Sequence, residues 1–438
     1  MEKISGCLLL ISIAVSLFLV TGCGGEEQAA SPGPVEAVQT SQESSGEITL
    51  VYWRHHYTPE KIAIDKLIAE YEAQNPGVKI VFNTLSYDTY VSKLVASIAA
   101  GEGPDIINIH NSWAYQYVKS GLLTPVPPEI MTTADIERDF FPLLSSFKKY
   151  DSYYGLAIGA SNLALYYNTK LFREAGLDPD RPPQTWEEMM ESAAKITRHD
   201  EHGRLQVAGA AIGQPQGQAW NYLTDCLIPQ NDCGSLDSDE NHVLWDSRSG
   251  YEAMEYMMGF CKNNYYSYMF LPPYEAFRLG RAGMLIDGSW AISQLKRDTP
   301  PDFEYRIAPI PHHKKQVVYG TYWANCVTKK ATGRARLEAW KFVKFITSKE
   351  TMLKWVDWVG ELPMRQEAAM DPELRKKYPQ LSAFLDQMPY TYASLKKDEG
   401  RYKQEIELAI ERVLLLHYTP EQSISQAAQE INRMLAAN

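Results

Sequence analysis

The chain has 438 residues, of which 45% are hydrophobic and 11% aromatic, and its formal net charge is −11. This apolar content is enough for two or three domains of roughly 100–200 residues each. The acidic balance, with no run of Lys or Arg, argues against a nucleic-acid-binding protein, because such proteins present a basic face to the phosphate backbone. An acidic surface fits a protein that works in solution outside the cell, but it does not identify a ligand.

The first 23 residues predict export and lipid attachment. Lys3 is followed by an uncharged, largely apolar stretch up to Gly22, which is the order of a secretory signal peptide. The stretch ends in Leu-Val-Thr-Gly-Cys, and this ending resembles a bacterial lipobox with Cys23 as the lipidated residue. An ordinary signal peptide and a membrane helix are the alternatives, and the apolar run lies near the lower limit for a helix that spans a bilayer. We therefore expect residues 1–22 to be a lipoprotein signal peptide.

Residues 23–46 are expected to form the lipidated cysteine and a flexible tether. The stretch has no aromatic residue, no Leu and no Ile, and it is rich in Ser, Gly, Pro, Gln and Glu. Such a composition cannot bury enough apolar surface to order itself. The predicted architecture is an anchor, a tether and a globular body that faces outward from the membrane.

From residue 48 the chain alternates between strand-like and helix-like patterns. Strands are expected at residues 48–53, 78–82 and 105–109, where apolar and β-branched residues concentrate. The helix after the first strand is expected to have Thr58 as its N-cap, with an apolar stripe of Ile64, Leu67, Ile68 and Tyr71. The next helix has a stripe of Val91, Leu94, Val95 and Ile98. Such βα units predict an α/β fold with a largely parallel sheet flanked by helices.

Later helices are marked by start signals. Capping boxes, in which a Thr is followed three residues on by Glu or Gln, begin at Thr185, Thr347 and Thr419. The second of these is expected to open a helix that runs to about Gly360, and an aromatic-rich helix is expected at residues 337–346. Tryptophans on helices are usually packed inside the protein. This predicts core positions for Trp340, Trp355 and Trp358.

Several segments of the chain stand in the order and spacing of one known family. They are Leu-Val-Tyr-Trp (50–53), Gly-Glu-Gly-Pro-Asp (101–105), Ser-Gly-Leu-Leu (120–123), Leu-Tyr-Tyr-Asn-Thr-Lys-Leu-Phe (165–172) leading into Pro-Gln-Thr-Trp-Glu-Glu (183–188), and Gly-Arg-Ala-Gly-Met with Gly-Ser-Trp (280–290). Through them the chain resembles the family 1 extracellular solute-binding proteins of bacterial ABC importers, the group that includes maltose-binding protein. The resemblance covers nearly everything after the tether.

The resemblance implies a two-lobe fold of the type II periplasmic-binding class, with the ligand in the cleft between the lobes. It places crossings between the lobes near residues 160–162, 319–320 and 360–363. The N-lobe would comprise residues 47–160 and 320–360, and the C-lobe residues 161–319 and 361–438. The implied function is capture of a mono- or oligosaccharide by closure of the cleft, followed by delivery to membrane permease subunits. No enzymatic activity, cofactor or metal is implied, and we expect a monomer on the outer face of the cell membrane.

A sugar offers ring faces that stack on aromatic side chains and hydroxyl groups that need donors and acceptors. Open α/β sheets bind ligands beyond the carboxyl ends of their strands. The residues of the matching loops are therefore candidate ligand contacts: Trp53, His55, Tyr87, Asn111, Ser112 and Trp113. The resemblance adds residues near the crossings and in the second lobe, of which Trp290 aligns with a stacking aromatic of the family: Ser161, Trp220, Trp290, Tyr322, Trp323 and Arg365.

Other functions remain open alternatives. A secreted glycoside hydrolase would need two carboxylates flanking one cleft, whereas the strand-end loops are rich in aromatic residues, His and Asn and poor in acids. A receptor of the same fold could instead take a polyamine, a glycerol phosphate or ferric ion. Phosphate esters favour Arg or helix N-termini, and iron favours clustered tyrosines such as residues 265–268, for which packing is the expected role.

Remaining motifs have structural interpretations. Nucleotide-loop, zinc-protease and nucleophile-elbow patterns are absent from the sequence. The His-Asp-Glu-His run at residues 199–202 is expected to be a solvated turn. Asp105 is expected to make a structural hydrogen bond at a strand start. Cys226 and Cys233 are either buried free thiols or a disulfide, because they are close enough in sequence to pair in an oxidising compartment.

Overall fold

The computed structural model describes residues 46–238 and 240–436. Residues from Glu47 onward form one compact unit. The predicted signal peptide, the predicted lipid site at Cys23 and most of the tether lie outside the described residues. Within the described ranges, none of the helices combines the length and the apolar character needed to cross a membrane.

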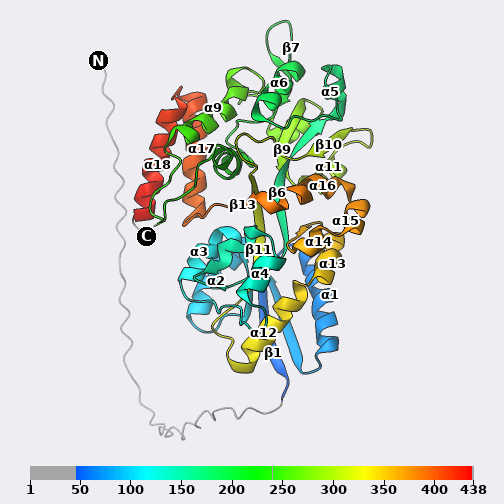
Figure 1. Cartoon of the computed structure of the whole chain (residues 1–438), viewed down its shortest axis with the longest axis vertical. Helices are drawn as coiled ribbons and strands as arrows, with labels where there is room; N and C mark the ends of the chain where they lie inside the picture. The colour runs from blue at the N-terminus through cyan, green and yellow to red at the C-terminus, as the bar shows by residue number, and fades with distance from the viewer. Residues whose placement is uncertain (1–45, 239, 437–438) are drawn as a thin grey trace, which may run out of the picture. The chain divides into compact units, whose positions relative to one another are not determined.

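One large mixed sheet runs through the unit (Figure 1). Its main path follows the order β2 (Val78–Leu85), β1 (Ile48–His55), β3 (Ile106–His110), β11 (Val318–Val327), β6 (Leu156–Asn168), β9 (Ala282–Gly288), β8 (Leu205–Ala210) and β7 (Arg198–His199). The strands β2, β1 and β3 pair in parallel and confirm the three strands predicted first along the chain. The side chain of Asp105 accepts a hydrogen bond from the Val51 amide (2.8 Å) at the entry to β3, which confirms its structural role.

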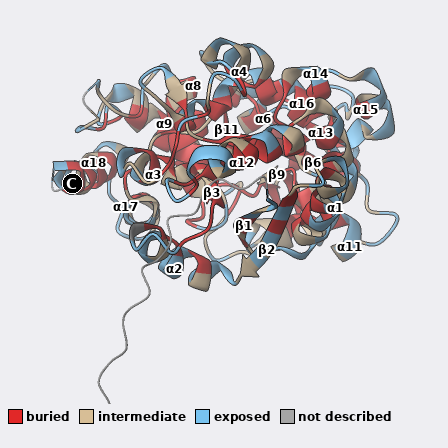
Figure 2. Ribbon diagram, turned by 90° about the horizontal axis from the view of Figure 1, so that it is seen from below, coloured by how far each residue is buried: buried red, intermediate tan, exposed pale blue. Residues whose placement is uncertain are grey.

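Strand β6 is the centre of the sheet and is buried along its whole length (Figure 2). It pairs with β11, β9, β10 (Tyr305–Ala308) and β12 (Leu362–Pro363). The three segments expected to cross between the lobes meet here, since Gly320 lies opposite Asn162 and Leu362 lies opposite Ala160. Crossing segments that lie side by side can bend together, which is what a hinge requires. The boundaries of the two lobes stay a prediction.

Helices cover the parallel strands at one end of the sheet. The helices α1 (Thr58–Gln74), α12 (Gly333–Ile346) and α13 (Lys349–Val359) pack on one another, and α2 (Tyr87–Ala99) packs on β1. Thr58 is not the N-cap of α1, because the helix begins at Thr58 itself and Tyr57 takes the cap position without a side-chain hydrogen bond. Thr347 is likewise not the cap of α13. Its hydroxyl donates to the Val343 carbonyl in the last turn of α12, and Ser348 caps α13 instead.

Two burial predictions for these helices are wrong in part. Leu94 and Ile98 of α2 are buried, but Val91 and Val95 are 41% and 50% exposed, since the sheet covers only one narrow side of this helix. Trp340 and Trp355 are fully buried as predicted. Trp358 is half-buried and lines a cavity, because α13 lies at the margin of the core.

A second group of helices packs around β6, β8 and β9. The longest are α6 (Trp186–Ile196), α9 (Arg248–Lys262), α17 (Glu399–Leu415) and α18 (Pro420–Ala436), and the last three pack together (Figure 1). Thr185 caps α6 by accepting from the Glu188 amide (3.2 Å). Thr419 and Gln422 exchange both hydrogen bonds of a capping box at the start of α18. Gly360 ends α13 in the left-handed conformation, with φ of 88°.

Short elements complete the unit. The short α-helices are α3 (Ala114–Lys119), α4 (Thr133–Asp139), α5 (Thr169–Glu174), α7 (Ala219–Asn221), α8 (Ile228–Gln230), α10 (Pro273–Arg278), α11 (Ala291–Asp298), α14 (Gln366–Ala369), α15 (Pro372–Lys377) and α16 (Ser382–Gln387). The 3-10 and π turns are η1 (Asn111–Trp113), η2 (Pro142–Phe147), η3 (Tyr222–Leu227), η4 (Pro379–Leu381) and η5 (Met388–Tyr390). The small strands are β4 (Lys148–Lys149), β5 (Ser152–Tyr153) and β13 (Thr391–Tyr392).

The cysteines and the histidine run have the structural roles that were expected of them. Cys226 and Cys233 are free thiols, and Cys226 is fully buried with its sulfur accepting from the Tyr319 amide. The run at residues 199–202 forms the turn between β7 and β8, with Asp200 bonded to neighbouring backbone amides. In the tyrosine cluster, Tyr266 is fully buried and donates to the Leu271 carbonyl, which confirms packing at that position.

Candidate functional site

Two cavities meet at Trp290. The first, of about 380 Å³, lies between β9, α10, α11 and the loop at residues 211–219, and we call it the Asp287 cavity. The second, of about 590 Å³, lies between β11, α11 and α13, and we call it the Glu361 cavity. The indole of Trp290 lines both. A half-buried aromatic ring shared by two cavities can serve as a stacking surface for a ligand that occupies either of them.

Local sequence places this ring. Strand β9 ends at Gly288, the Ser289 amide donates to the Asn162 carbonyl (3.2 Å), and Trp290 then takes the N-cap position of α11. A β-carbon on Gly288 would overlap the Trp290 ring, so only glycine lets the indole lie against the backbone here. The Gly-Ser-Trp motif therefore connects β9 to α11 and places the Trp290 indole at the two cavities.

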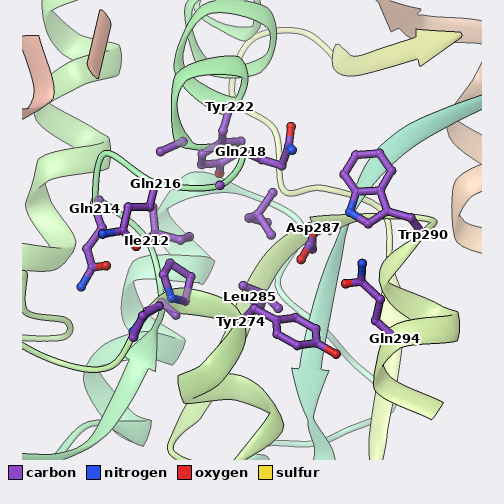
Figure 3. A pocket seen from close by; sticks show the side chains of 17 residues that line it. Ile212, Gln214, Gln216, Gln218, Tyr222, Tyr274, Leu285, Asp287, Trp290 and Gln294 are labelled. Atoms are coloured by element: carbon purple, nitrogen blue, oxygen red, sulfur yellow. The ribbon is translucent and has the colours of Figure 1, made fainter. Parts of the chain in front are cut away.

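The Asp287 cavity is lined by neutral polar groups and a single charged one. Figure 3 shows the carboxylate of Asp287 between Trp290 and Tyr274, with the amide of Gln294 beside them. Three further glutamines belong to the lining, Gln214, Gln216 and Gln218, and the Gln214 amide donates to the carbonyls of Ser267 and Tyr268. Burial raises the pKa of Asp287 to about 6, although hydrogen bonds from the Gly288 amide and the Trp290 indole oppose the rise.

Four predicted site residues form one aromatic cluster beside the Glu361 cavity. His55 stacks on Trp323 with ring centroids 4.0 Å apart, and Trp113 meets Trp323 edge-on at 5.3 Å. Tyr87 contacts both His55 and Trp113. Burial, with the nearby Arg54 charge, lowers the pKa of His55 to about 3, so this ring is neutral at any physiological pH. Loops from three strand ends and β11 thus build a single uncharged aromatic wall.

His110 is a site residue that sequence reasoning missed, because the third strand was expected to end at residue 109. Its Nε2 lies 2.7 Å from the Thr321 hydroxyl, and its Nδ1 lies 2.6 Å from the hydroxyl of Ser112. Burial lowers the pKa of His110, while the charge of Glu399 opposes that change. Ser112 also donates to the Glu399 carboxylate (2.6 Å) at the start of α17. The hydroxyl predicted to contact ligand is therefore engaged by the protein in this structure.

Three other predicted residues lie in or next to the lining of the Glu361 cavity, with different orientations. Ser161 lines the Glu361 cavity from the middle of β6. Asn111 is buried, and its side-chain oxygen accepts from the Thr321 hydroxyl and from the Tyr322 amide. Tyr322 reaches the cavity wall, but its side chain is only 2% exposed and packs against Phe147. Successive residues of a strand point to opposite faces, so Trp323 rather than Tyr322 joins the aromatic wall.

The structure does not bring the remaining three predicted residues to the two cavities. Trp53 is half-buried against the core at the end of β1. Trp220 is buried beneath the ammonium of Lys396, which lies 5.0 Å from its ring. Arg365 is buried and bonded to the Asp139 carboxylate (2.8 Å) and to the Thr347 carbonyl, and these contacts account for its burial.

Beside the Glu361 cavity, at the third crossing, three charged side chains lie close together. Arg54 and Glu60 form a buried ion pair, and Glu361 accepts a hydrogen bond from the Trp355 indole (2.8 Å). A β-carbon on Gly159 would overlap the Glu361 carboxylate, so β6 approaches this side chain closely. Burial and the charge of Glu60 raise the pKa of Glu361 to about 7, and the Trp355 and Arg54 groups oppose the rise.

This pKa predicts a pH-dependent stability. The ordinary value is 4.5 and the folded value is about 7, so the folded state holds a proton that the unfolded state has lost between these two values. The free energy of unfolding therefore falls as pH rises through this window. Urea unfolding of Glu361→Gln is expected to show a smaller fall between pH 5 and pH 7.5, roughly the window these pKa values set. Glu373→Gln, at an exposed carboxylate, should leave the slope as it is, and an unaltered slope in Glu361→Gln would contradict the assignment.

The arrangement favours binding over bond cleavage. Within the described part of the chain, no three His, Cys, Asp or Glu side chains are grouped so that they could hold a metal ion. The Asp287 cavity has one carboxylate, whereas glycoside hydrolysis uses a pair that flanks the scissile bond. Around Trp290 the two cavities offer aromatic rings, amides and hydroxyls, and such groups recognise a ligand.

Comparison with known proteins agrees with this arrangement. Residues 66–383 match the model of a family described as bacterial extracellular solute-binding protein. A maltotriose-binding protein of Pyrococcus abyssi is 27% identical over 388 residues, covering 86% of this chain and 79% of that protein. The sn-glycerol-3-phosphate-binding periplasmic protein UgpB of Escherichia coli is 22% identical, covering 88% of this chain and 92% of that protein.

A solved structure shows the same fold. The sugar-binding protein MalE of Xanthomonas citri superposes with a TM-score of 0.77 at 20% identity, over 89% of this chain and 98% of that one. The α/β fold predicted from the βα pattern, and the fold class predicted from the resemblance, are both confirmed by this likeness.

Proposed function

The chain belongs to the bacterial extracellular solute-binding proteins, and on this premise we propose that it captures a mono- or oligosaccharide at Trp290 for an ABC importer. The observation that carries the proposal is the indole of Trp290, which lines both cavities among neutral amide and hydroxyl groups. Sugar rings stack on such aromatic faces, and their hydroxyls pair with such polar groups. Its role is solute binding and not catalysis.

Cleft closure is the proposed signal. The segments expected to cross between lobes pair side by side at Ala160 and Asn162 of β6. A ligand that contacts both walls at once stabilises the closed arrangement, and permease subunits can then distinguish the loaded from the empty receptor. The aromatic wall of His55, Trp113 and Trp323 would face the ligand from one side and Trp290 from the other.

The names of similar proteins support a sugar and also suggest one competitor. The Pyrococcus protein is named for maltotriose and the Escherichia coli protein for sn-glycerol 3-phosphate. Phosphate esters favour cationic donors such as Arg and Lys, and the described lining of the Asp287 cavity has a carboxylate and no cation. The charge of this cavity therefore favours the sugar.

A thermal-shift screen of the purified protein tests the proposal. The panel contains monosaccharides, maltodextrins and other oligosaccharides, sn-glycerol 3-phosphate, spermidine and ferric citrate. A ligand that binds only the folded state raises the melting temperature by mass action. A shift with saccharides and no hydrolysed product supports the proposal. A shift confined to the phosphate, the polyamine or iron would overturn the sugar, and release of hydrolysed glycan would overturn the receptor.

We further propose that Cys23 carries the lipid that holds the receptor on the outer face of the cell membrane. Dual acyl chains bind a membrane stably, whereas one chain binds it only marginally. Cys23→Ser is expected to move the protein from the membrane fraction to the soluble exported fraction and to abolish labelling by a palmitate analogue. Cys7→Ser, within the apolar stretch, is the matched control. Retention of the label in Cys23→Ser would contradict the proposal.

A further inference from the structure

Among the described residues, Asp287 is the single charged side chain that lines its cavity. The other polar lining groups are neutral, namely four glutamine amides and the hydroxyls of two tyrosines: Gln214, Gln216, Gln218, Gln294, Tyr222 and Tyr274. Figure 3 shows Asp287 directed into the space between Trp290, Tyr274 and Gln294. A ligand stacked on the Trp290 indole would therefore lie against this carboxylate.

The protein leaves the charge of Asp287 uncompensated. Its carboxylate accepts hydrogen bonds from the Gly288 amide (2.7 Å) and from the Trp290 indole. Among the described residues that line this cavity there is no Lys, Arg or His. A carboxylate has about four lone-pair sites, so acceptor capacity remains for a ligand. A poorly solvated acceptor gains more from a ligand donor than a solvated one does.

The neighbouring Glu361 cavity does not supply the missing positive charge. Its acidic lining residues are Glu361 and Asp357, and Asp357 is paired with Lys377 (2.7 Å). Lys296 is exposed at the edge of this cavity, where solvent screens its charge. An anionic group held at Trp290 would thus meet the Asp287 carboxylate with no buried cation to balance the repulsion.

Resting on the proposed function, we propose that Asp287 determines the charge specificity of the site, so that it accepts uncharged or amine-bearing sugars and excludes uronic acids and phosphate esters. Paired hydroxyls of a sugar ring can donate to the two carboxylate oxygens, and an ammonium group can form an ion pair with them. An ionised carboxylate or phosphate of a ligand has no hydrogen to donate to Asp287, and its negative charge is repelled by the Asp287 carboxylate. Like charges opposed across a binding site are an efficient means of rejecting the wrong partner.

Calorimetric titration of the purified full chain tests this inference with glucose, glucosamine, glucuronate and maltotriose. The unmodified protein is expected to bind the neutral and amine-bearing sugars at least about tenfold more tightly than glucuronate. Asp287→Asn keeps the shape and one acceptor oxygen but removes the charge. Its preference for glucose over glucuronate should shrink by about tenfold, and its preference for glucosamine should disappear. Asp302→Asn, at an exposed carboxylate, should change none of these ratios.

The pH dependence of affinity supplies a second measurement that a purely structural role would not change. The ionisable groups around Asp287 are Tyr166 of β6, Tyr222 of η3 and Tyr274 of α10, and burial raises the pKa of all three. None of these tyrosines titrates near neutrality. Below about pH 6 the protonated Asp287 stops repelling anions, so glucuronate affinity should rise more steeply as pH falls in the unmodified protein than in Asp287→Asn, in which Glu361 of the adjoining cavity still titrates.

The outcomes separate the two proposals. Asp287→Asn could bind neutral, amine-bearing and anionic sugars with the same affinity ratios as the unmodified protein. That result would overturn the role of Asp287 and leave the sugar receptor in place. Tight binding of glucuronate by the unmodified protein would do the same. The unmodified protein could bind none of the four sugars and no saccharide of the thermal-shift panel. That result would overturn the proposed function, and this inference with it.

Discussion

Replacing Trp290 by alanine is expected to weaken saccharide binding by about tenfold or more while the fold survives. The indole is the surface shared by the Asp287 cavity and the Glu361 cavity, and its removal joins them into a wider, solvent-filled space. A stacked aromatic contributes roughly 0.5–1.5 kcal/mol beyond the area it buries, and 1.4 kcal/mol corresponds to about a factor of ten in affinity. Because the ring is only half-buried, its loss leaves no sealed hole in the core.

Two matched variants make this result interpretable. Trp290→Phe keeps an aromatic face and should retain most of the affinity, whereas Tyr418→Ala removes an exposed aromatic far along the chain that lines neither cavity. Isothermal titration with the best saccharide of the screen measures the dissociation constants, and circular dichroism verifies the fold. A folded Trp290→Ala protein with unaltered affinity would remove Trp290 from the site.

Lys396→Met is expected to destabilise the fold by about 3–5 kcal/mol, because it leaves the buried carboxylate of Asp225 without its counter-charge. Asp225 is fully buried and Lys396 is 3% exposed, with nitrogen and oxygen 2.9 Å apart. The Ser394 amide and the Thr224 hydroxyl also donate to this carboxylate. Urea denaturation of the purified variant measures the loss. A loss below about 1 kcal/mol, typical of an exposed pair, would contradict the account.

The matched variants distinguish a buried charge from a missing side chain. Lys403→Met breaks a half-exposed contact with Glu407 and should cost less than about 1 kcal/mol. Adding Asp225→Leu to Lys396→Met removes both charges and should recover much of the loss, since apolar pairs often replace buried ion pairs without penalty. The buried pair also fixes the chain just before Glu399, which bonds to Ser112. Ligand binding is therefore expected to weaken together with stability in Lys396→Met.

Signals that act within one or two turns of chain were predicted correctly from the residues. Thr419 with Gln422 and Thr185 with Glu188 form their capping hydrogen bonds, and Gly360 ends its helix, because each depends on neighbours in the sequence. Two adjacent hydroxyl residues, Thr347 and Ser348, were harder to assign. Both residues can cap a helix, but the Thr347 hydroxyl is bonded to the preceding helix. Ser348 is therefore the residue whose hydroxyl caps α13.

Burial depended on partners that lie far along the chain. The apolar stripe of α2 predicted that Val91 and Val95 are buried. The neighbouring elements cover only the side of α2 that carries Tyr90, Leu94 and Ile98. Trp358 packs against the core with one part of its surface and lines a cavity with the rest, for the same reason. Periodicity identifies which residues share a face of a helix, but it does not determine how much of that face another element covers.

The amino-acid sequence by itself determined the α/β class, the family and the strand-end loops that supply His55, Tyr87 and Trp113, because parallel strands end at one edge of a sheet. Trp323 was predicted from the family resemblance, and it lies on β11. Only the tertiary structure showed that His110 bonds to Ser112 and Thr321, and that the half-buried Asp287 and Glu361 each line one of the two cavities. The physical reason is that a side chain's charge state and solvation depend on everything packed around it. For Glu361 those groups include Arg54, Glu60 and Gly159, which lie hundreds of positions away in the chain.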